Sequence, residues 1–174
     1  MRKYAGDKGP IFYVQVRIGK NGKLFKMYKY RSMVVDANKK LEQYIEENEN
    51  VKEEYKKYKK LKKDPRITKV GRILRATSLD EFPQFINVLK GEMSLVGPRP
   101  YLPREKSEMN GYFKHITSLQ PGITGFWQIS GRSDVTFNDR LEKDMNYYEN
   151  HCLKMDLKII IKTIEKIVKR EGAI

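Results

Sequence analysis

The strongest constraint on the fold lies near the start of the chain, where two strand-like segments flank a turn. Residues 11–18 and 24–30 are rich in apolar, aromatic and β-branched side chains, and Gly-Lys-Asn-Gly-Lys separates them. An Asn-Gly pair between two such segments favours a tight turn joining antiparallel strands. The sequence therefore predicts a β-hairpin over 11–30. Because the later periodic segments are helical, the expected class is α+β, a small antiparallel hairpin element surrounded by several helices.

Residues 34–63 are helical by composition but carry only a thin apolar stripe. The segment begins acidic and ends with seven lysines between positions 52 and 63. That polarity complements the helix dipole. We expect a protruding, solvated helix or helical pair that ends at Asp64-Pro65, because the residue before a proline disfavours helix.

A further helix is predicted from Ser78. Ser78-Leu79-Asp80-Glu81 has the form of a capping box, with Ser78 as N-cap and Glu81 as the third helical residue. Pro83 would remove one helical hydrogen bond and bend this helix. Large apolar residues then recur at the spacing of one helical face, which predicts packing against a core. They are Phe82, Phe85, Ile86 and Leu89.

The segment 155–170 is amphipathic, with a broad apolar face and lysines mainly opposite. A basic amphipathic helix can lie in a membrane interface, or it can close a soluble core, and the pattern leaves both open. The lysines and arginine at 26, 29 and 31 likewise favour either a solvated strand face or a surface for phosphates or lipid headgroups. No run of 18 apolar residues exists, so no membrane-spanning segment is predicted.

Length and charge narrow the class of protein. A chain of 174 residues fits one domain, 1–174, and its net charge of +14 implies an anionic partner: nucleic acid, an anionic membrane surface or phosphorylated substrates. Cys152 is the only cysteine, which excludes intrachain disulfides and any zinc site with two cysteine ligands. His115 and His151 lack metal-ligand spacing and are expected to be structural or surface residues.

Asp80 and Glu81 are the candidate catalytic residues, with Arg75 before them and Arg99 in the rigid sequence Gly-Pro-Arg-Pro after them. Carboxylates beside guanidinium groups suit an anionic, metal-bound substrate, because cations take phosphate while carboxylates bind Mg²⁺ or attack phosphorus. The structural alternative is ordinary first-turn acids and surface salt bridges. Spacing alone leaves both interpretations open.

Several stretches in order carry a resemblance to a known family. They are residues 9–33, the long motif DPRITKVGRILRATSLDEFPQFINVLKGEMSLVGPRP at 64–100, QPGITGFWQISGR at 120–132, and the closing DMNYY and MDLK at 144–148 and 155–158. Over most of residues 9–170 the chain resembles the bacterial sugar transferases, monotopic polyprenyl-phosphate phosphoglycosyl transferases. The segment with Trp127 and Tyr147-Tyr148 is more similar to the exopolysaccharide-initiating hexose-phosphate transferases.

The resemblance implies transfer of a sugar 1-phosphate from a UDP-sugar to polyprenyl (undecaprenyl) phosphate, with release of UMP. It implies a covalent sugar-phosphate intermediate on Asp80, with Glu81 as the partner carboxylate and both as ligands of Mg²⁺. The catalytic dyad is expected at a helix N-terminus. Arg75 and Arg99 are implied as substrate phosphate-binding residues.

The family usually has a hydrophobic membrane segment immediately before Gly-Pro-Ile-Phe, whereas only eight residues precede Gly9 here. We therefore expect a catalytic domain without its membrane anchor, soluble or peripheral, acting at the cytoplasmic face of the bacterial inner membrane. Two other functions compete with this enzyme. A basic nucleic-acid-binding module would use the aromatic, basic hairpin, and a non-catalytic membrane-surface scaffold would use the terminal helix.

Overall fold

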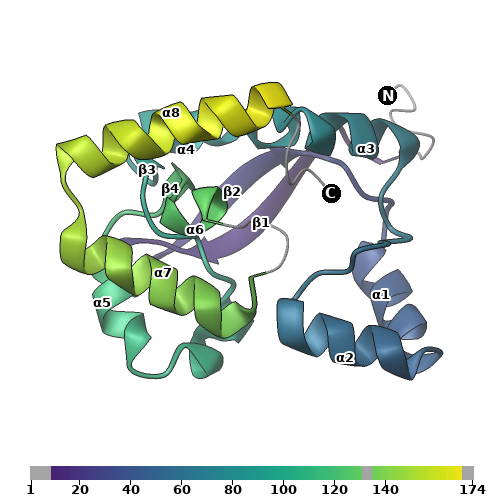
Figure 1. Ribbon diagram of the computed structural model, residues 1–174. Coiled ribbons are helices and arrows are strands. Elements are labelled where there is room, and N and C mark those ends of the chain that lie inside the picture. The colour runs from purple at the N-terminus through teal and green to yellow at the C-terminus, as the bar shows by residue number, and fades with distance from the viewer. Residues whose placement is uncertain (1–8, 131–134, 170–174) are drawn as a thin grey trace.

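The computed structural model describes residues 9–130 and 135–169 of the chain (Figure 1). Its class is mixed helix and strand, with a two-stranded antiparallel hairpin and helices around it, so the predicted α+β class is confirmed. The elements are β1 (Phe12–Ile18), β2 (Leu24–Tyr30), α1 (Ala37–Glu46), α2 (Glu49–Tyr58), α3 (Lys69–Ala76), α4 (Gln84–Leu89), β3 (Ser94–Val96), α5 (Tyr112–Ser118), β4 (Gly122–Thr124), α6 (Phe126–Ile129), α7 (Phe137–Asn150) and α8 (Leu153–Lys169).

The hairpin forms where the sequence predicts it. β1 and β2 pair antiparallel from Phe12 opposite Tyr30 to Ile18 opposite Leu24. The connection is a short 3₁₀ turn in which Asn21 and Gly22 take φ values of 56° and 76°. Asparagine and glycine tolerate this left-handed region best, which is why the Asn-Gly pair identifies the turn.

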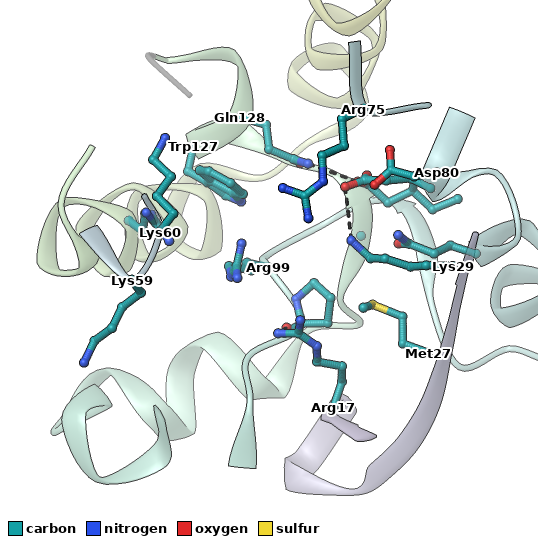
Figure 2. A pocket seen from close by; sticks show the side chains of 16 residues that line it. Arg17, Met27, Lys29, Lys59, Lys60, Arg75, Asp80, Arg99, Trp127 and Gln128 are labelled. Carbon is teal, nitrogen blue, oxygen red and sulfur yellow. Dashed lines mark hydrogen bonds and ion pairs between the residues drawn. The ribbon is translucent and has the colours of Figure 1, made fainter. Parts of the chain in front are cut away.

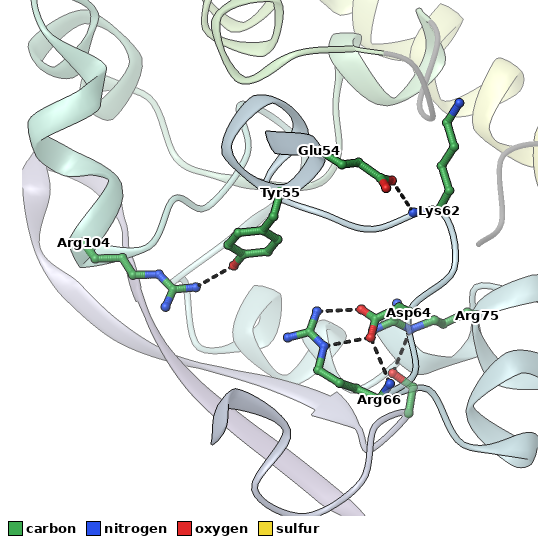
Figure 3. A network of polar contacts seen from close by, with 8 residues as sticks. Glu54, Tyr55, Lys62, Asp64, Arg66, Arg75 and Arg104 are labelled. Atoms are coloured by element: carbon green, nitrogen blue, oxygen red, sulfur yellow. Dashed lines mark hydrogen bonds and ion pairs between the residues drawn. The ribbon is translucent and has the colours of Figure 1, made fainter. Parts of the chain in front are cut away.

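The segment 34–63 forms the predicted helical pair, α1 and α2. The pair lies beside the rest of the molecule (Figure 1). Side chains near the end of α2 attach it to the body: Arg104 donates to the Tyr55 hydroxyl at 3.3 Å, and Lys59 pairs with Glu108 at 2.8 Å. Figure 3 shows the Arg104 contact together with the loop that leads from α2 to α3. The end of α2 is thereby held against the body.

The segment around Ser78 differs from the prediction. Leu79–Glu81 is a 3₁₀ turn, Ser78 has a φ of 56° with no side-chain capping bond, and α4 begins only at Gln84. The predicted capping box is therefore wrong, and Pro83 precedes the helix rather than bending it. Proline has no N–H to complete a helical turn and is favoured at a helix start, so the α-helix begins after it.

The prediction that the apolar face of α4 packs against a core is also wrong. Phe82, Phe85, Ile86 and Leu89 are exposed, Leu89 at 89%, whereas Asn87 is fully buried. The Asn87 side chain accepts from the Tyr28 N–H at 3.1 Å and donates to the Lys26 carbonyl at 2.8 Å. α4 thus lies against the open edge of β2, whose unpaired backbone groups need polar partners.

A second, parallel pair joins β3 and β4, with Ser94 opposite Gly122 and Val96 opposite Thr124. It was not predicted from the sequence. Gly97 donates to the Thr124 carbonyl at 3.0 Å, and Gly122 donates to the Pro98 carbonyl at 2.9 Å. A Cβ atom at either glycine would collide with the other strand's backbone. This close approach fixes the start of the turn that carries Arg99.

Helix α8 runs along one side of the molecule near α4 and the β3–β4 pair (Figure 1). Its Ile159 is buried with Val96 and Tyr147. The remaining apolar face of α8 is largely exposed, at Leu157, Ile161, Ile164 and Val168. The helix therefore closes part of a core and also leaves an apolar outer surface. No helix in residues 9–130 and 135–169 combines the length and apolar character needed to cross a bilayer.

Candidate active site

All four predicted site residues line one cavity of about 280 Å³ (Figure 2). Asp80 and Glu81 come from the 3₁₀ turn, Arg75 from the last turn of α3, and Arg99 from the turn after β3. In Figure 2, Asp80 and Lys29 lie on one side, Lys59 and Lys60 on the opposite side, and Arg75 and Arg99 between them. The fold thus brings together residues from separate parts of the chain.

The two carboxylates of the dyad have different surroundings. Asp80 is 9% exposed. Glu81 pairs through Oε1 with the Lys29 ammonium at 3.3 Å. Lys29 reaches the cavity from β2, so this lysine faces the site rather than a solvated or lipid-facing strand surface. Because their surroundings differ, the two carboxylates can have different chemical roles.

Arg75 is positioned by the way α3 docks on the end of the hairpin. The Thr68 side chain caps α3 by accepting from the Gly71 N–H at 2.9 Å, and a Cβ at Gly71 would collide with the Ser32 backbone. The Arg75 Nε atom then donates to the Ser32 hydroxyl at 2.9 Å. Burial lowers the pKa of Arg75 and the Asp80 charge opposes this shift, so the guanidinium interacts with the dyad.

The loop that enters α3 is braced by an ion pair. The Arg66 guanidinium makes two hydrogen bonds to the Asp64 carboxylate, at 2.8 and 2.6 Å (Figure 3). Such bidentate pairing adds geometric definition as well as energy. Both side chains are largely buried, so the pair fixes the path of the chain between α2 and Arg75.

Arg99 is held from behind by a buried carboxylate. The Arg99 N–H and the Tyr101 hydroxyl both donate to Asp144 Oδ2, at 3.1 and 2.7 Å. Asp144 lies on α7 and is fully buried, and burial raises the pKa of its carboxyl to about 7. The Arg99 guanidinium carbon lies 5.4 Å from the centre of the Trp127 ring. Asp144 therefore orients the turn while the Arg99 side chain faces the cavity.

Sequence reasoning missed several basic residues of the cavity. Arg17 is 8% exposed on β1, and Arg140 is 3% exposed on α7. A usable signal exists for Arg140, which falls in register with the buried Phe137, Leu141 and Asp144 on one helical face. In all, seven basic residues face two acidic ones here: Arg17, Lys29, Lys59, Lys60, Arg75, Arg99 and Arg140 against Asp80 and Glu81.

An apolar groove of about 430 Å³ adjoins the polar cavity. Its walls come from the dyad segment, α4, α6 and α8, including Leu79, Phe82, Ile160 and Ile164. Glu81, Ile123 and Gln128 line both spaces. A ligand with an anionic head and an apolar tail could therefore occupy the two together.

The donor set at the dyad fits a hard divalent cation. Asp80 and Glu81 offer carboxylate oxygens, and Mg²⁺ in proteins commonly takes one or two carboxylates together with substrate phosphates. Within the described residues, no group of three or more His, Cys, Asp or Glu side chains could hold a metal ion. His115, His151 and Cys152 do not line the cavity.

Comparisons with known proteins agree with the resemblance in the motifs. The family model described as bacterial sugar transferase matches residues 3–170. The chain is 44% identical to an undecaprenyl-phosphate galactose phosphotransferase of Salmonella typhimurium, over 98% of this chain and 36% of the relative. It is 41% identical to a UDP-glucose:undecaprenyl-phosphate glucose-1-phosphate transferase of Klebsiella pneumoniae, over 92% of this chain and 33% of the relative.

A shorter relative is covered more fully. The chain is 42% identical to the exopolysaccharide production protein ExoY of Sinorhizobium fredii, over 96% of this chain and 74% of that protein. Against the Salmonella and Klebsiella relatives, this chain spans only about a third of their length.

Proposed function

Because this chain belongs to the bacterial sugar transferase family, we propose that it transfers a sugar 1-phosphate from a UDP-sugar to polyprenyl phosphate, with release of UMP. The relatives named above for phosphotransferase activity act on undecaprenyl phosphate according to their names. The family favours this enzyme over a nucleic-acid-binding module or a non-catalytic membrane scaffold.

The observation that carries the proposal is that the polar cavity and the apolar groove meet at the acidic dyad. The polar cavity holds the dyad and seven basic residues, which suits a nucleoside diphosphate. The apolar groove begins at Glu81 and runs between α4 and α8, which suits an isoprenoid chain. Both substrates of the proposed reaction would therefore meet beside Asp80.

In the proposed mechanism, an Asp80 carboxylate oxygen attacks the phosphorus atom that bears the sugar. The bond between the two phosphates breaks, its electron pair stays on the UMP oxygen, and an aspartyl sugar-phosphate forms. A phosphate oxygen of the polyprenyl phosphate then attacks the same phosphorus and releases Asp80. The cations around the dyad reduce the repulsion between the carboxylate and the phosphate.

Glu81 and Asp80 are the residues that would hold Mg²⁺. The ion would neutralise phosphate charge and favour departure of the leaving group. Lys29 orients Glu81 through their ion pair. Arg75, whose Nε atom donates to the Ser32 hydroxyl, would bind the phosphate that Asp80 attacks. Its side chain lies between Asp80 and Arg99 in Figure 2.

The test follows UMP released from a UDP-sugar in the presence of Mg²⁺. Without polyprenyl phosphate, we expect one equivalent of UMP per protein molecule, and with the lipid we expect continued turnover, because the mechanism has two steps. The matched control is Asp80→Asn, which keeps the size of the side chain and loses the nucleophile. Release of UMP by this variant at the wild-type rate would overturn the proposal.

A further inference from the structure

Three guanidinium groups gather in the cavity away from the dyad. Arg17 arrives from β1, Arg99 from the turn after β3, and Arg140 from α7. Arg17 and Arg140 are both buried. In Figure 2, Arg99 lies beyond Arg75 as seen from Asp80, and Arg17 lies below Arg75 and Asp80. The family resemblance implies no role for Arg17, which lies in the matched stretch 9–33, or for Arg140, which lies outside the matched stretches.

These three guanidinium groups have no direct carboxylate partner within the described part of the chain. No ion pair there joins Arg17, Arg99 or Arg140 to a carboxylate. The Nε atoms of Arg17 and Arg140 are buried without a hydrogen-bond partner. Burial, reinforced by repulsion from Arg99, lowers the pKa of Arg17 to about 9 and that of Arg140 to about 10.

Burying like charges close together is costly, and a bound anion would offset that cost. An anion bound among the three guanidinium groups would do so, because charge-assisted hydrogen bonds to phosphate are strong. Glu105 attracts Arg17 and Arg140, and Asp144 attracts Arg140, without a direct ion pair. Both carboxylates instead accept hydrogen bonds from neutral donors: the Leu102 N–H for Glu105, and the Tyr101 hydroxyl and the Arg99 N–H for Asp144.

The three groups are held in place before any ligand arrives. Arg17 Nη1 donates to the Pro100 carbonyl at 3.0 Å, directly beside Arg99. Arg140 Nη2 donates to the Tyr58 carbonyl at 2.5 Å, and its guanidinium carbon lies 5.3 Å from the Trp127 ring centre. Arg99 stacks near the same ring. Such preorganisation favours binding because little ordering remains to be done.

We infer that Arg17 and Arg140, together with Arg99, bind the nucleotide phosphate of the donor, the phosphate that leaves as UMP. The inference rests on the proposed function. The sugar-bearing phosphate must contact Asp80, so the second phosphate has to lie farther along the cavity. When the bond between the phosphates breaks, negative charge develops on that second phosphate, and fixed cations there stabilise the transition state.

The lipid phosphate is a poorer fit to these three residues. None of Arg17, Arg99 and Arg140 lines the apolar groove, and neither does Trp127. A polyprenyl phosphate with its chain in the groove would approach from the side of Glu81 and Gln128, which line both spaces. The arginine end of the cavity is therefore left to the water-soluble nucleotide.

Trp127 provides the measurement, because it is the only tryptophan of the chain and lines this end of the cavity. Its fluorescence can follow the binding of UDP, UMP and uridine to the intact chain without any turnover. The test variants are Arg17→Gln and Arg140→Gln. The matched control is Arg72→Gln, which removes the same charge from an exposed site on α3 that lines neither space.

We expect each test variant to bind UDP and UMP at least about tenfold more weakly, as loss of a charged hydrogen bond predicts. Arg72→Gln should stay near the wild type, and the affinity for uridine should be unchanged throughout, because uridine carries no phosphate. An equal loss of uridine affinity would mean that the cavity had collapsed, and would overturn the assignment.

Failure of this inference can be told apart from failure of the proposed function. Sugar-phosphate transfer with equal UDP affinity in the wild type, Arg17→Gln and Arg140→Gln would overturn the nucleotide-phosphate subsite and leave the transferase mechanism. Conversely, loss of UDP binding in both variants of a chain that transfers no sugar phosphate would support the subsite and overturn the mechanism.

Discussion

At the scale of single residues, the cavity uses each guanidinium group differently. Arg75 is tied to Ser32 beside the dyad, whereas Arg99 extends from a turn whose backbone is fixed by Asp144. Because the backbone at Arg99 is fixed and its guanidinium lies near the Trp127 ring, the geometry of the guanidinium, and not its charge alone, should determine how phosphate is bound.

Arg99→Lys is therefore expected to lower kcat/KM for the UDP-sugar by at least about tenfold, or about 1.4 kcal/mol of transition-state stabilisation. Lysine keeps the charge but loses the bidentate fork. The measurement is UMP release under steady-state conditions, with thermal unfolding as a control. Unchanged kinetics with a large fall in melting temperature would assign Arg99 to the fold instead.

Asp144 makes the stability of the fold depend on pH. Burial raises the pKa of its carboxyl from 3.8 to about 7, so the folded chain binds this proton more tightly than the unfolded chain does. Tyr101, Arg99 and Arg140 favour the charged form without overcoming burial. The free energy of unfolding should accordingly fall as pH rises from about 4 to about 7, and level off above that.

The corresponding variant is Asp144→Asn, which cannot ionise. Denaturant unfolding of the wild type should lose on the order of 2–4 kcal/mol across that pH window relative to the variant. Parallel pH profiles for the two proteins would contradict the assignment of the titration to Asp144.

At the scale of elements, α4 is turned the opposite way from its sequence pattern. Asn87 is buried against β2, and the apolar residues point outward. We predict that Asn87→Leu lowers the free energy of unfolding by about 2–4 kcal/mol, because it removes the partner of the Tyr28 N–H and the Lys26 carbonyl and leaves both without it.

Leu89→Ser is the matched control on the same helix, and its side chain is exposed. It should change the free energy of unfolding by no more than about 0.5 kcal/mol. Urea titration of both variants measures the difference. The opposite order of effects would mean that α4 packs through its apolar face, as periodicity alone predicts.

The elements that were predicted correctly are those whose structure depends on neighbouring residues in the sequence. The hairpin follows from Asn21-Gly22, and the pair α1–α2 follows from composition between 34 and 63. The orientation of α4 does not follow from periodicity, because it depends on the edge of a strand some 60 residues earlier, where Asn87 meets Lys26. The β3–β4 pair has strands of three residues each, too short to give a pattern.

The residues of the candidate site likewise fall into two groups, those that the sequence indicates and those that only the tertiary structure reveals. Asp80, Glu81, Arg75 and Arg99 lie within one motif, so the sequence points to them directly. Arg17 and Lys29 come from the hairpin and Arg140 from α7, and only tertiary folding brings their side chains to the dyad. Their roles, and those of the four motif residues, stay predictions.

At the scale of the whole molecule, apolar and basic surfaces lie together. α8 exposes Leu157, Ile161 and Ile164, and it also exposes Lys158 and Lys162. With a net charge of +14, the chain should bind vesicles containing anionic lipid weakly and reversibly. Each surface cation contributes about 1 kcal/mol near such a membrane.

Co-sedimentation across a salt series measures this binding, which should fade between low and roughly physiological salt because the attraction is screened. The double variant Lys158→Glu/Lys162→Glu should bind more weakly than the wild type at low salt, and vesicles of neutral lipid serve as the control. Absence of binding to anionic vesicles at low salt would mean that the basic surface serves another purpose.

The covalent step on Asp80 is the central claim, and intact-protein mass spectrometry tests it most directly. The chain is incubated with Mg²⁺ and UDP-glucose or UDP-galactose, the sugars suggested by the relatives' names. We expect a mass increase of one hexose phosphate in the wild type, no increase in Asp80→Asn, and loss of the adduct when polyprenyl phosphate is added. Transfer of sugar phosphate to the lipid without any adduct, or an adduct that also forms on Asp80→Asn, would contradict a covalent step on Asp80.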